Sequence, residues 1–274
     1  MEFRLCHFNT EDELNKLVEL QTEVYRERGL HFSTELFKNW YVNNPDGQVI
    51  SYNAFDGDQM VAHQSFVPEK MEVDGRLVRC LRSMAVVTHP DYRGRGLFAK
   101  LTNLALDEAK RQGYEFAYAI SNANSTPIFL KNCGFKQVTK LNVKIGFGTN
   151  VKEDGNHIYK RFWTDETLKW RLGMHKYRKY KNSIIGKYAY GVNTYMATLQ
   201  DDVCENLMID SKKSNFGVYL YVGLGAKLPL TYIDMPKFIK HSPFNLIFQD
   251  LTGGKLPEMK SNNVFYQLLD YDVV

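Results

Sequence analysis

A strand that runs into an arginine-glycine turn and then into a helix is the feature that most constrains this chain. Residues 84–87 (Met-Ala-Val-Val) end a predicted strand over 77–88, and His89-Pro90 interrupts it. Apolar residues at helical spacing then predict a helix over 94–112, which ends at Gly113. A strand that is nearly all apolar at its end is typical of a central strand covered on both faces of a sheet. Together these elements predict an α/β fold.

The segments around this turn predict a mixed-sheet α/β domain over residues 1–148. Thr10-Glu11-Asp12-Glu13 has the spacing of a helix capping box, and the turn formers Asp56-Gly57-Asp58 and Asp74-Gly75 predict two hairpins. The expected order is strand 3–8, helices 10–24 and 34–41, strands 49–55, 60–73 and 77–88, helix 94–112, strand 115–120, helix 122–133 and strand 135–147.

A second domain is expected over residues 149–274, because residues 146–155 are rich in turn formers and polar side chains. A helix that contains a tryptophan and precedes strand-like residues is predicted twice, with Trp40 in the first half and Trp170 in the second. Either a diverged duplication or chance similarity explains this echo. The second domain is thus expected to be α/β as well.

Composition argues against several classes of function. The chain has 35 basic and 31 acidic residues, and so small an excess does not indicate nucleic-acid binding. No run approaches the ~18 consecutive apolar residues of a membrane span, and the N-terminus lacks the features of a signal peptide. We therefore expect a cytoplasmic protein without a membrane span.

The cysteines lie far apart and lack the paired spacing of a zinc site. They are Cys6, Cys80, Cys133 and Cys204. No histidine partner is identifiable that would make Cys80 a nucleophile. We therefore expect reduced, mostly buried thiols and no metal cofactor.

The turn Arg93-Gly94-Arg95-Gly96 is suited to holding a phosphate group. Glycine lets the backbone approach a ligand closely, and the first amides of a helix lack internal partners and attract anions. The spacing matches neither the three-glycine dinucleotide fingerprint nor the Walker loop. On these residues alone, a loop cap with two solvated arginines is an equally good interpretation.

A wider comparison of the sequence favours the ligand-binding interpretation. The stretch from Ser83 to Val138 resembles the acyl-CoA-binding half of the GNAT superfamily of N-acyltransferases. The resemblance is carried by Val-Val-Thr-His-Pro-Asp-Tyr-Arg-Gly-Arg-Gly-Leu-Phe at 86–98 and by Asn-Ser-Thr-Pro-Ile-Phe-Leu-Lys-Asn-Cys-Gly-Phe at 124–135. The family pattern is Gln or Arg, two residues, Gly, one residue, then Gly or Ala. Arg93 and Gly96 match it, whereas Phe98 replaces the final small residue.

The resemblance implies roles for the main chain of this region. The amides from Arg95 to Ala99 would hold the pyrophosphate of coenzyme A, and Val86 and Thr88 would pair with its pantetheine arm like an added strand. The amide of Val86 or Val87 would polarise the thioester carbonyl. The full set of expected cofactor-binding residues is Val86, Thr88, Arg93, Gly94, Arg95, Gly96, Leu97, Phe98, Ala99 and Asn124.

No general acid is identified from the sequence. Many relatives use a tyrosine at the position that Leu130 occupies here, so the acid must lie elsewhere or proximity and carbonyl polarisation must suffice. Tyr92 and Tyr118 are candidates, although each is more often a packed aromatic residue.

His63 is the candidate base, because a neutral imidazole in a strand-like run could accept the ammonium proton near physiological pH. A hydrogen-bonded structural histidine is the competing interpretation. Glu69 and Glu72 flank a predicted hairpin and are expected to be solvated.

The resemblance to the GNAT superfamily implies transfer of an acyl group from acetyl-CoA or a short hydroxyacyl-CoA to a primary amine. Two-domain relatives favour, as the acceptor, a dTDP- or UDP-linked amino sugar of bacterial surface polysaccharide, including lipopolysaccharide. A degenerate GNAT-like second domain would shape that acceptor site. A small non-nucleotide amine or antibiotic as the acceptor, and a non-catalytic acyl-CoA-binding protein, are the alternatives.

Two further expectations concern the second half of the chain. Its aromatic residues would either stack on the acceptor or form that domain's core: Trp163, Trp170, Tyr177, Tyr180, Tyr188, Tyr190 and Tyr195. The sequence does not determine the oligomeric state; sheet edges in this family often pair between subunits, so the resemblance leaves both a monomer and a homodimer open.

Overall fold

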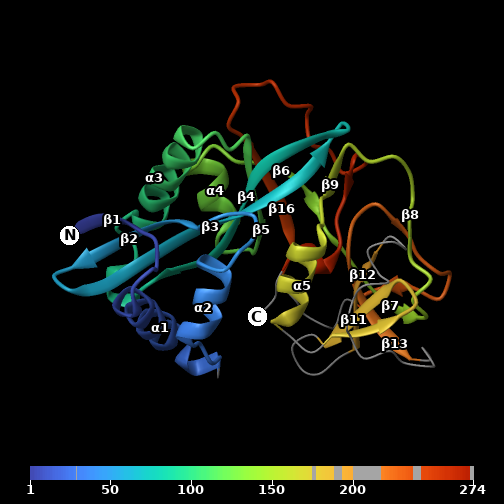
Figure 1. Ribbon diagram of the computed structural model, residues 1–274, viewed down its shortest axis with the longest axis horizontal. Helices are drawn as coiled ribbons and strands as arrows, with labels where there is room; N and C mark the ends of the chain where they lie inside the picture. Colours follow the sequence, from blue (N-terminus) through green and yellow to red (C-terminus); the bar gives the residue numbers. More distant parts are fainter. Residues whose placement is uncertain (29, 175–176, 188–192, 200–216, 237–241, 272–274) are drawn as a thin grey trace. The chain divides into compact units, whose positions relative to one another are not determined.

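The computed structural model describes residues 1–28, 30–174, 177–187, 193–199, 217–236 and 242–271 (Figure 1). It divides into two units that exchange segments of the chain. The first unit comprises Met1–Lys70, Val78–Gln137 and Leu246–Pro257, and the second comprises Met71–Leu77, Val138–Asn245 and Glu258–Val274. The domain boundary predicted at residue 148 thus differs from this division, which places residues 138–148 in the second unit.

Side-chain caps begin the first two helices of the first unit. The Thr10 hydroxyl accepts a hydrogen bond from the Glu13 amide, and Ser33 accepts one from Leu36, so each cap satisfies an amide that a helix start leaves unpaired. The helices are α1 (Glu11–Tyr25), α2 (Thr34–Tyr41), α3 (Leu97–Arg111) and α4 (Thr126–Asn132), with 3-10 turns η1 (Arg26–Arg28) and η2 (Pro90–Tyr92).

The strands of the first unit form a mixed sheet. They are β1 (Glu2–Cys6), β2 (Ile50–Asp56), β3 (Gln59–Val73), β4 (Arg76–Thr88), β5 (Phe116–Ser121), β6 (Lys136–Lys140) and β16 (Asn245–Asp250). Their order is β1-β2-β3-β4-β5-β16-β6, with β1–β2 and β2–β3 antiparallel and β4–β5 parallel. Asp74 and Gly75, both with positive φ (51° and 74°), form the predicted tight turn between β3 and β4.

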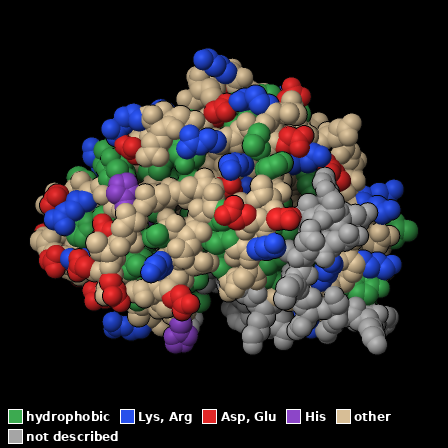
Figure 2. Space-filling view, in the orientation of Figure 1, with side chains coloured by type: hydrophobic (Ala, Val, Ile, Leu, Met, Phe, Trp, Pro, Cys, Tyr) green, Lys and Arg blue, Asp and Glu red, His purple; other side chains and the backbone are tan. Residues whose placement is uncertain are grey.

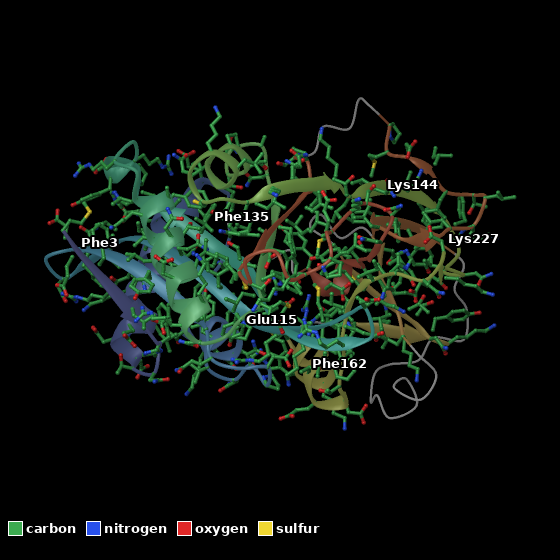
Figure 3. The ribbon with its side chains drawn as sticks, turned by 90° about the horizontal axis from the view of Figure 1, so that it is seen from above. Phe3, Glu115, Phe135, Lys144, Phe162 and Lys227 are labelled. Atoms are coloured by element: carbon green, nitrogen blue, oxygen red, sulfur yellow. The ribbon has the colours of Figure 1, made fainter. Side chains whose placement is uncertain are left out.

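Helices cover both faces of this sheet, with α1 and α2 on one face and α3 and α4 on the other (Figure 1). Beneath α3 and α4 a buried cluster joins Leu81, Phe129, Phe135 and Ile247. Phe135, labelled in Figure 3, packs on Phe129 with ring centroids 4.8 Å apart. The predicted α/β class is therefore confirmed. The predicted burial of the apolar end of β4 holds for Val87 but not for Met84, Ala85 and Val86, which are only half-buried.

The second unit carries a sheet of its own. Its elements are β7 (Asn142–Phe147), β8 (Lys152–Glu153), β9 (Tyr159–Arg161), α5 (Asp165–Gly173), β10 (Arg178–Tyr180), β11 (Ser183–Lys187), β12 (Asn193–Thr198), β13 (Val218–Gly223), β14 (Ala226–Lys227), β15 (Ile233–Asp234), β17 (Val264–Phe265) and the 3-10 turn η4 (Leu268–Asp270). The main sheet has the order β10-β11-β12-β13-β7-β15. Strands β10, β11 and β12 are antiparallel to one another in turn, and β12 pairs with β13 in parallel.

This order repeats that of the first unit. In both units a helix precedes three strands joined in sequence, and the third strand then pairs in parallel with a fourth. The repeat agrees with the predicted degenerate second domain.

One predicted strand, 135–147, is corrected by the structure. It divides at Leu141 into β6 and β7, which lie in different sheets. Strand β7 joins the second sheet between β13 and β15, where Lys144 of β7 (Figure 3) forms an ion pair with Asp234. In exchange, β16 enters the first sheet between β5 and β6.

The cysteines and the surface agree with an ordinary globular chain. Among the described residues, Cys6, Cys80 and Cys133 are buried and form no disulfide bond, and burial raises the pKa of Cys6 and of Cys133 to about 11. Cys204 lies outside the described residues, as do Tyr188 and Tyr190. Figure 2 shows acidic and basic side chains interspersed on the visible face. None of the described helices has the length and apolar character that a bilayer crossing requires.

The exchanged strand should stabilise the first unit. Ile247 on β16 is fully buried in its core, so Ile247→Ala should lower the free energy of unfolding by about 2–5 kcal/mol. Chemical denaturation measures this change. The control Ile233→Ala, at a side chain 61% exposed, should change it by less than about 0.5 kcal/mol. Equal effects of the two substitutions would contradict the assigned place of β16.

Candidate functional site

Strands β4 and β5 pair over only part of their length. Their described register joins Cys80–Arg82 to Phe116–Tyr118 and ends there, although β4 continues to Thr88. The edge of β4 beyond Arg82 is thus not paired with β5 within the described register. An unpaired strand edge offers main-chain donors and acceptors to an extended ligand.

A left-handed residue, called the Ala85 bulge below, sets the direction of the β4 main chain in this stretch. Ala85 has a φ of 54°, a left-handed conformation that is uncommon for a residue with a side chain. Downstream of it, the His89 amide donates to the Val61 carbonyl oxygen on β3 at 2.9 Å. Successive amides of a strand point to opposite sides. Counting back from His89, the Val87 amide is directed toward β3, whereas the amides of Val86 and Thr88 are directed away from it.

This alternation directs the amides of Val86 and Thr88 away from β3, as their expected roles require, and those roles stay predictions. It also favours Val86 over Val87 as the amide that polarises a carbonyl, since the Val87 amide is directed to β3. The Thr88 carbonyl already accepts a hydrogen bond from Arg93 Nε at 3.3 Å, which leaves its amide as the group available for a ligand.

The start of α3 has free amides. Its N-cap residue, Gly96, has a φ of 71° and provides no side-chain cap, unlike Thr10 of α1 and Ser33 of α2. The first amides of α3, at Leu97, Phe98 and Ala99, are therefore left to bind an anion, which the helix dipole favours.

Neither glycine of the turn is required by packing. A Cβ added at Gly94 or Gly96 would meet nothing within 4 Å. What both positions need is the positive φ, 76° and 71° respectively, and the close approach that a missing side chain allows.

The arginines and Asn124 lie at the surface around this turn. Arg95 donates to the Asp91 carbonyl oxygen at 3.0 Å and lies over the Tyr92 ring, with its Cζ 4.7 Å from the centroid. Arg93 and Asn124 are exposed, and the Asn124 amide donates to Asn122 Oδ1.

Phe98, the departure from the family pattern, packs edge-to-face on Phe129 with ring centroids 4.9 Å apart. It therefore fills space between α3 and α4, and its amide keeps its place in the first turn of α3.

His63 lies in the core of the first unit rather than at a surface. Its side chain is buried, with Nδ1 2.6 Å from Asn53 Oδ1 and Nε2 3.0 Å from the Tyr41 hydroxyl oxygen. Because an amide oxygen only accepts, Nδ1 carries the proton and Nε2 accepts from Tyr41. Burial lowers the pKa of His63 to about 3, so the ring is neutral at physiological pH. Its role as the base stays a prediction, and both nitrogens already have partners.

The other acid and base candidates are also engaged. Tyr92 donates to Asp56 Oδ2 at 2.7 Å, and this hydrogen bond raises the pKa of Tyr92. Tyr118 is buried, and its hydroxyl donates to Glu69 Oε2. Leu130 packs against the core beneath α4, so no proton donor stands at that position.

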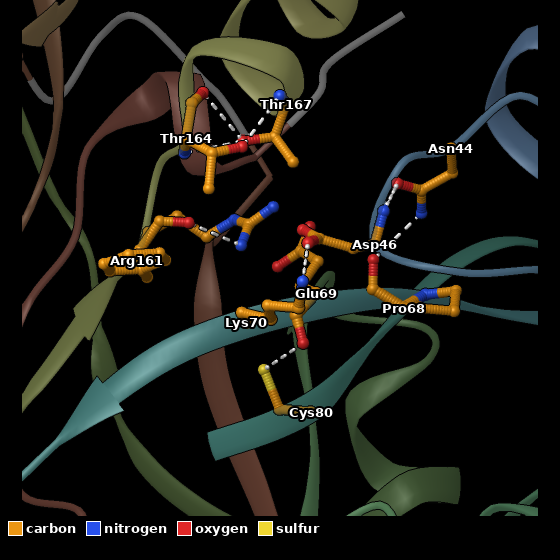
Figure 4. Close-up of polar contacts among 10 residues, drawn as sticks. Asn44, Asp46, Pro68, Glu69, Lys70, Cys80, Arg161, Thr164 and Thr167 are labelled. Carbon is orange, nitrogen blue, oxygen red and sulfur yellow. Dashed lines mark hydrogen bonds and ion pairs between the residues drawn. The ribbon is translucent and has the colours of Figure 1, made fainter. Parts of the chain in front are cut away.

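The expectation that Glu69 is solvated is wrong. Its side chain is buried, and Arg82 Nε donates to it at 2.7 Å. Cys80 Sγ donates to the Glu69 carbonyl oxygen at 3.4 Å (Figure 4), which agrees with a buried, structural thiol. Sequence periodicity did not reveal this ion pair, because Glu69 and Arg82 lie on neighbouring strands, 13 residues apart.

Comparison with known proteins finds a family match in the first half of the chain. Residues 7–138 match a family model described as an acetyltransferase (GNAT) domain. This segment, just under half of the chain, is thus similar to GNAT acetyltransferase domains. The catalytic class expected from the sequence, an acyl-CoA-dependent N-acyltransferase, is that of the matched family.

Solved structures share the fold across nearly the whole chain. A probable N-acyltransferase from Enterococcus faecalis V583 is 11% identical, with a TM-score of 0.57, and the match covers 92% of this chain and 73% of that one. GCN5-related N-acetyltransferases from Anabaena variabilis and Kribbella flavida are 9% and 13% identical, with TM-scores of 0.56 and 0.54. These matches also cover 92% of this chain, and 74% and 73% of theirs. A comparison with curated proteins found no match.

Gly96→Glu should greatly weaken the binding of acetyl-CoA at the turn formed by residues 93–96. A carboxylate beside the first amides of α3 would occupy and repel the phosphate position, so we expect affinity for acetyl-CoA to fall about a hundredfold or more, about 2.8 kcal/mol. Isothermal titration calorimetry measures it. Gly113→Glu is a matched control, since it has a similar φ (76°) and open surroundings at the other end of α3. Unchanged affinity in Gly96→Glu would contradict the site.

His63 should make the protein less stable in acid. Its folded pKa of about 3 lies below the ordinary 6.5, so the unfolded state binds the proton first and stability falls as pH drops below about 6.5. At pH 5 the loss should be about 2 kcal/mol relative to neutral pH. Urea unfolding of wild type and of His63→Gln, each at pH 7 and at pH 5, isolates the loss of stability that His63 causes. Equal losses in the two proteins would contradict it.

Proposed function

We propose that the chain transfers an acyl group from acyl-CoA to a primary amine on a small molecule. The observation that carries this proposal is the uncapped start of α3 next to the bulged, partly unpaired end of β4. The α3 amides would hold the pyrophosphate, and the Thr88 amide would pair with the pantetheine arm. The Val86 amide would donate to the thioester oxygen as negative charge develops on it.

The reaction needs little else from the protein. The amine nitrogen attacks the thioester carbonyl carbon, the carbon–sulfur bond breaks, the amine loses a proton and the coenzyme A thiolate gains one. Leu130 stands where relatives have an acid, and the Tyr118 hydroxyl is bound to Glu69. The chain would therefore act chiefly by orienting the two substrates and polarising the carbonyl.

As the acceptor we propose the amino group of a nucleotide-linked amino sugar. Support comes from a cavity of about 270 Å³ in the second unit, which is lined by the aromatic residues Phe162, Trp163 and Phe265. Its charged lining residues are Lys160 and Arg161 together with Glu72, Glu153 and Asp270, and Lys160 forms an ion pair with Glu153 at 3.0 Å. Aromatic rings stack on bases, so the support for a nucleotide comes from these rings and not from the charge of the lining. Other aromatic residues of this half, such as Tyr177 and Tyr195, are buried and belong to the core.

Thiol release tests this proposal. Acetyl-CoA and 3-hydroxybutyryl-CoA would be offered with dTDP- and UDP-linked amino sugars, and with the corresponding free amino sugars. We expect release with a nucleotide sugar and at least tenfold less with its free sugar.

Other outcomes of this assay separate the alternatives. Equal release with free amines would replace the nucleotide sugar with a small non-nucleotide acceptor. Binding of acetyl-CoA without release on any amine would contradict catalysis and favour an acyl-CoA-binding role.

A further inference from the structure

The bulge at Ala85 needs support from its surroundings. A left-handed conformation is disfavoured for alanine, and such a conformation persists only where neighbouring groups fix it. The residues on either side, Met84 and Val86, are only half-buried. Hydrogen-bond donors to the carbonyl groups of the bulge would fix this conformation.

Two buried side chains donate directly to these carbonyl groups. Ser65 Oγ on β3 donates to the Met84 carbonyl oxygen at 2.5 Å, and Gln21 Nε2 on α1 donates to the Ala85 carbonyl oxygen at 3.2 Å. Both side chains are almost fully buried, with 0% and 2% of their surface exposed. Hydrogen bonds shielded from water in this way hold their geometry more firmly than exposed ones.

Further contacts tie this arrangement to two other helices. The Tyr41 hydroxyl oxygen on α2 lies 2.9 Å from Ser65 Oγ. From the opposite face of the sheet, Gln64 Nε2 donates to Ser83 Oγ at 3.0 Å, and Gln64 Oε1 accepts from Thr102 on α3. The segment 83–85 is thus held from both faces.

The bond from Gln21 has a direct consequence for Val86. The Ala85 carbonyl and the Val86 amide belong to one planar, trans peptide unit, in which the C=O and N–H bonds point in opposite directions. A donor that fixes the Ala85 oxygen therefore also fixes the Val86 N–H, which is directed away from Gln21. Ser65 fixes the preceding peptide plane in the same way.

We infer that Gln21 and Ser65 are positioning residues, which aim the Val86 amide at the thioester carbonyl by holding the Ala85 bulge. This inference rests on the proposed function, because it assigns a role in carbonyl polarisation. Neither side chain touches the substrate. Their removal should therefore weaken polarisation more than it weakens binding, since the α3 amides that hold the pyrophosphate are elsewhere.

Gln21→Met and Ser65→Ala remove the two donors, and Ser51→Ala is a matched control. Ser51 pairs with Ser65 in the β2–β3 register and is equally buried, but its hydroxyl donates to the Gln64 carbonyl oxygen rather than to β4. A loss of stability common to any buried serine should appear in both alanine variants. Thermal unfolding would establish that all the variants fold.

The readout is the ¹³C resonance of [1-¹³C]acetyl-CoA bound to each variant, together with its affinity by calorimetry. We expect wild type and Ser51→Ala to move the carbonyl resonance downfield of the free thioester. In Gln21→Met and Ser65→Ala the bound carbonyl resonance should move at least halfway back to the position of the free thioester, while the affinity for acetyl-CoA changes less than about threefold. With a productive amine, kcat should fall about 10–100-fold in these two variants at an unchanged KM.

Three results would overturn the inference. One is a bound carbonyl resonance that stays at the wild-type position in both Gln21→Met and Ser65→Ala. Another is an equal change in Ser51→Ala, which would make the effect a general loss of packing. Failure of the wild type to bind acetyl-CoA would overturn the proposed function as well, and so is distinguishable from the first two.

Discussion

The candidate site depends on the end of strand β4, which continues beyond its described pairing with β5. Pairing with β5 is described only as far as Arg82 and Tyr118, and the left-handed Ala85 then turns the following peptides. Unpaired main-chain groups at a strand edge need water or a ligand. The same strand leads directly into a helix whose first amides also lack a side-chain cap. Two sets of unsatisfied donors thus follow one another within about a dozen residues.

The polar residues beneath β4 explain why the core of this domain is not uniformly apolar. Burying hydroxyl, amide and imidazole groups is costly unless each finds a partner, and here His63, Tyr41, Ser65 and Gln21 do so. Such a network fixes geometry more narrowly than apolar packing would. Burial within this network lowers the pKa of His63. A ring with both nitrogens occupied and almost no exposed surface is better placed to support the sheet than to receive a proton from an amine.

The exchange of β7 and β16 links the two halves of the sequence through their sheets. Strand β7, which precedes residue 148, lies in the second sheet, and β16, at residues 245–250, lies in the first sheet. Neither sheet is therefore complete without both halves of the chain. A boundary drawn in the sequence at residue 148 cannot represent this arrangement, because composition and turn signals report only on neighbouring residues.

The sequence by itself determined the strand, turn and helix around Gly94 and Gly96, since glycine, arginine and helical periodicity act over short distances. It also determined the α/β class and the family resemblance, which the match over residues 7–138 confirms. Tertiary structure alone decided that Glu69 is a buried partner of Arg82 and that residues 135–147 divide between two sheets. It likewise decided that Gln21 reaches Ala85, 64 residues away. These facts depend on which distant segments meet, and no local pattern of side chains encodes that.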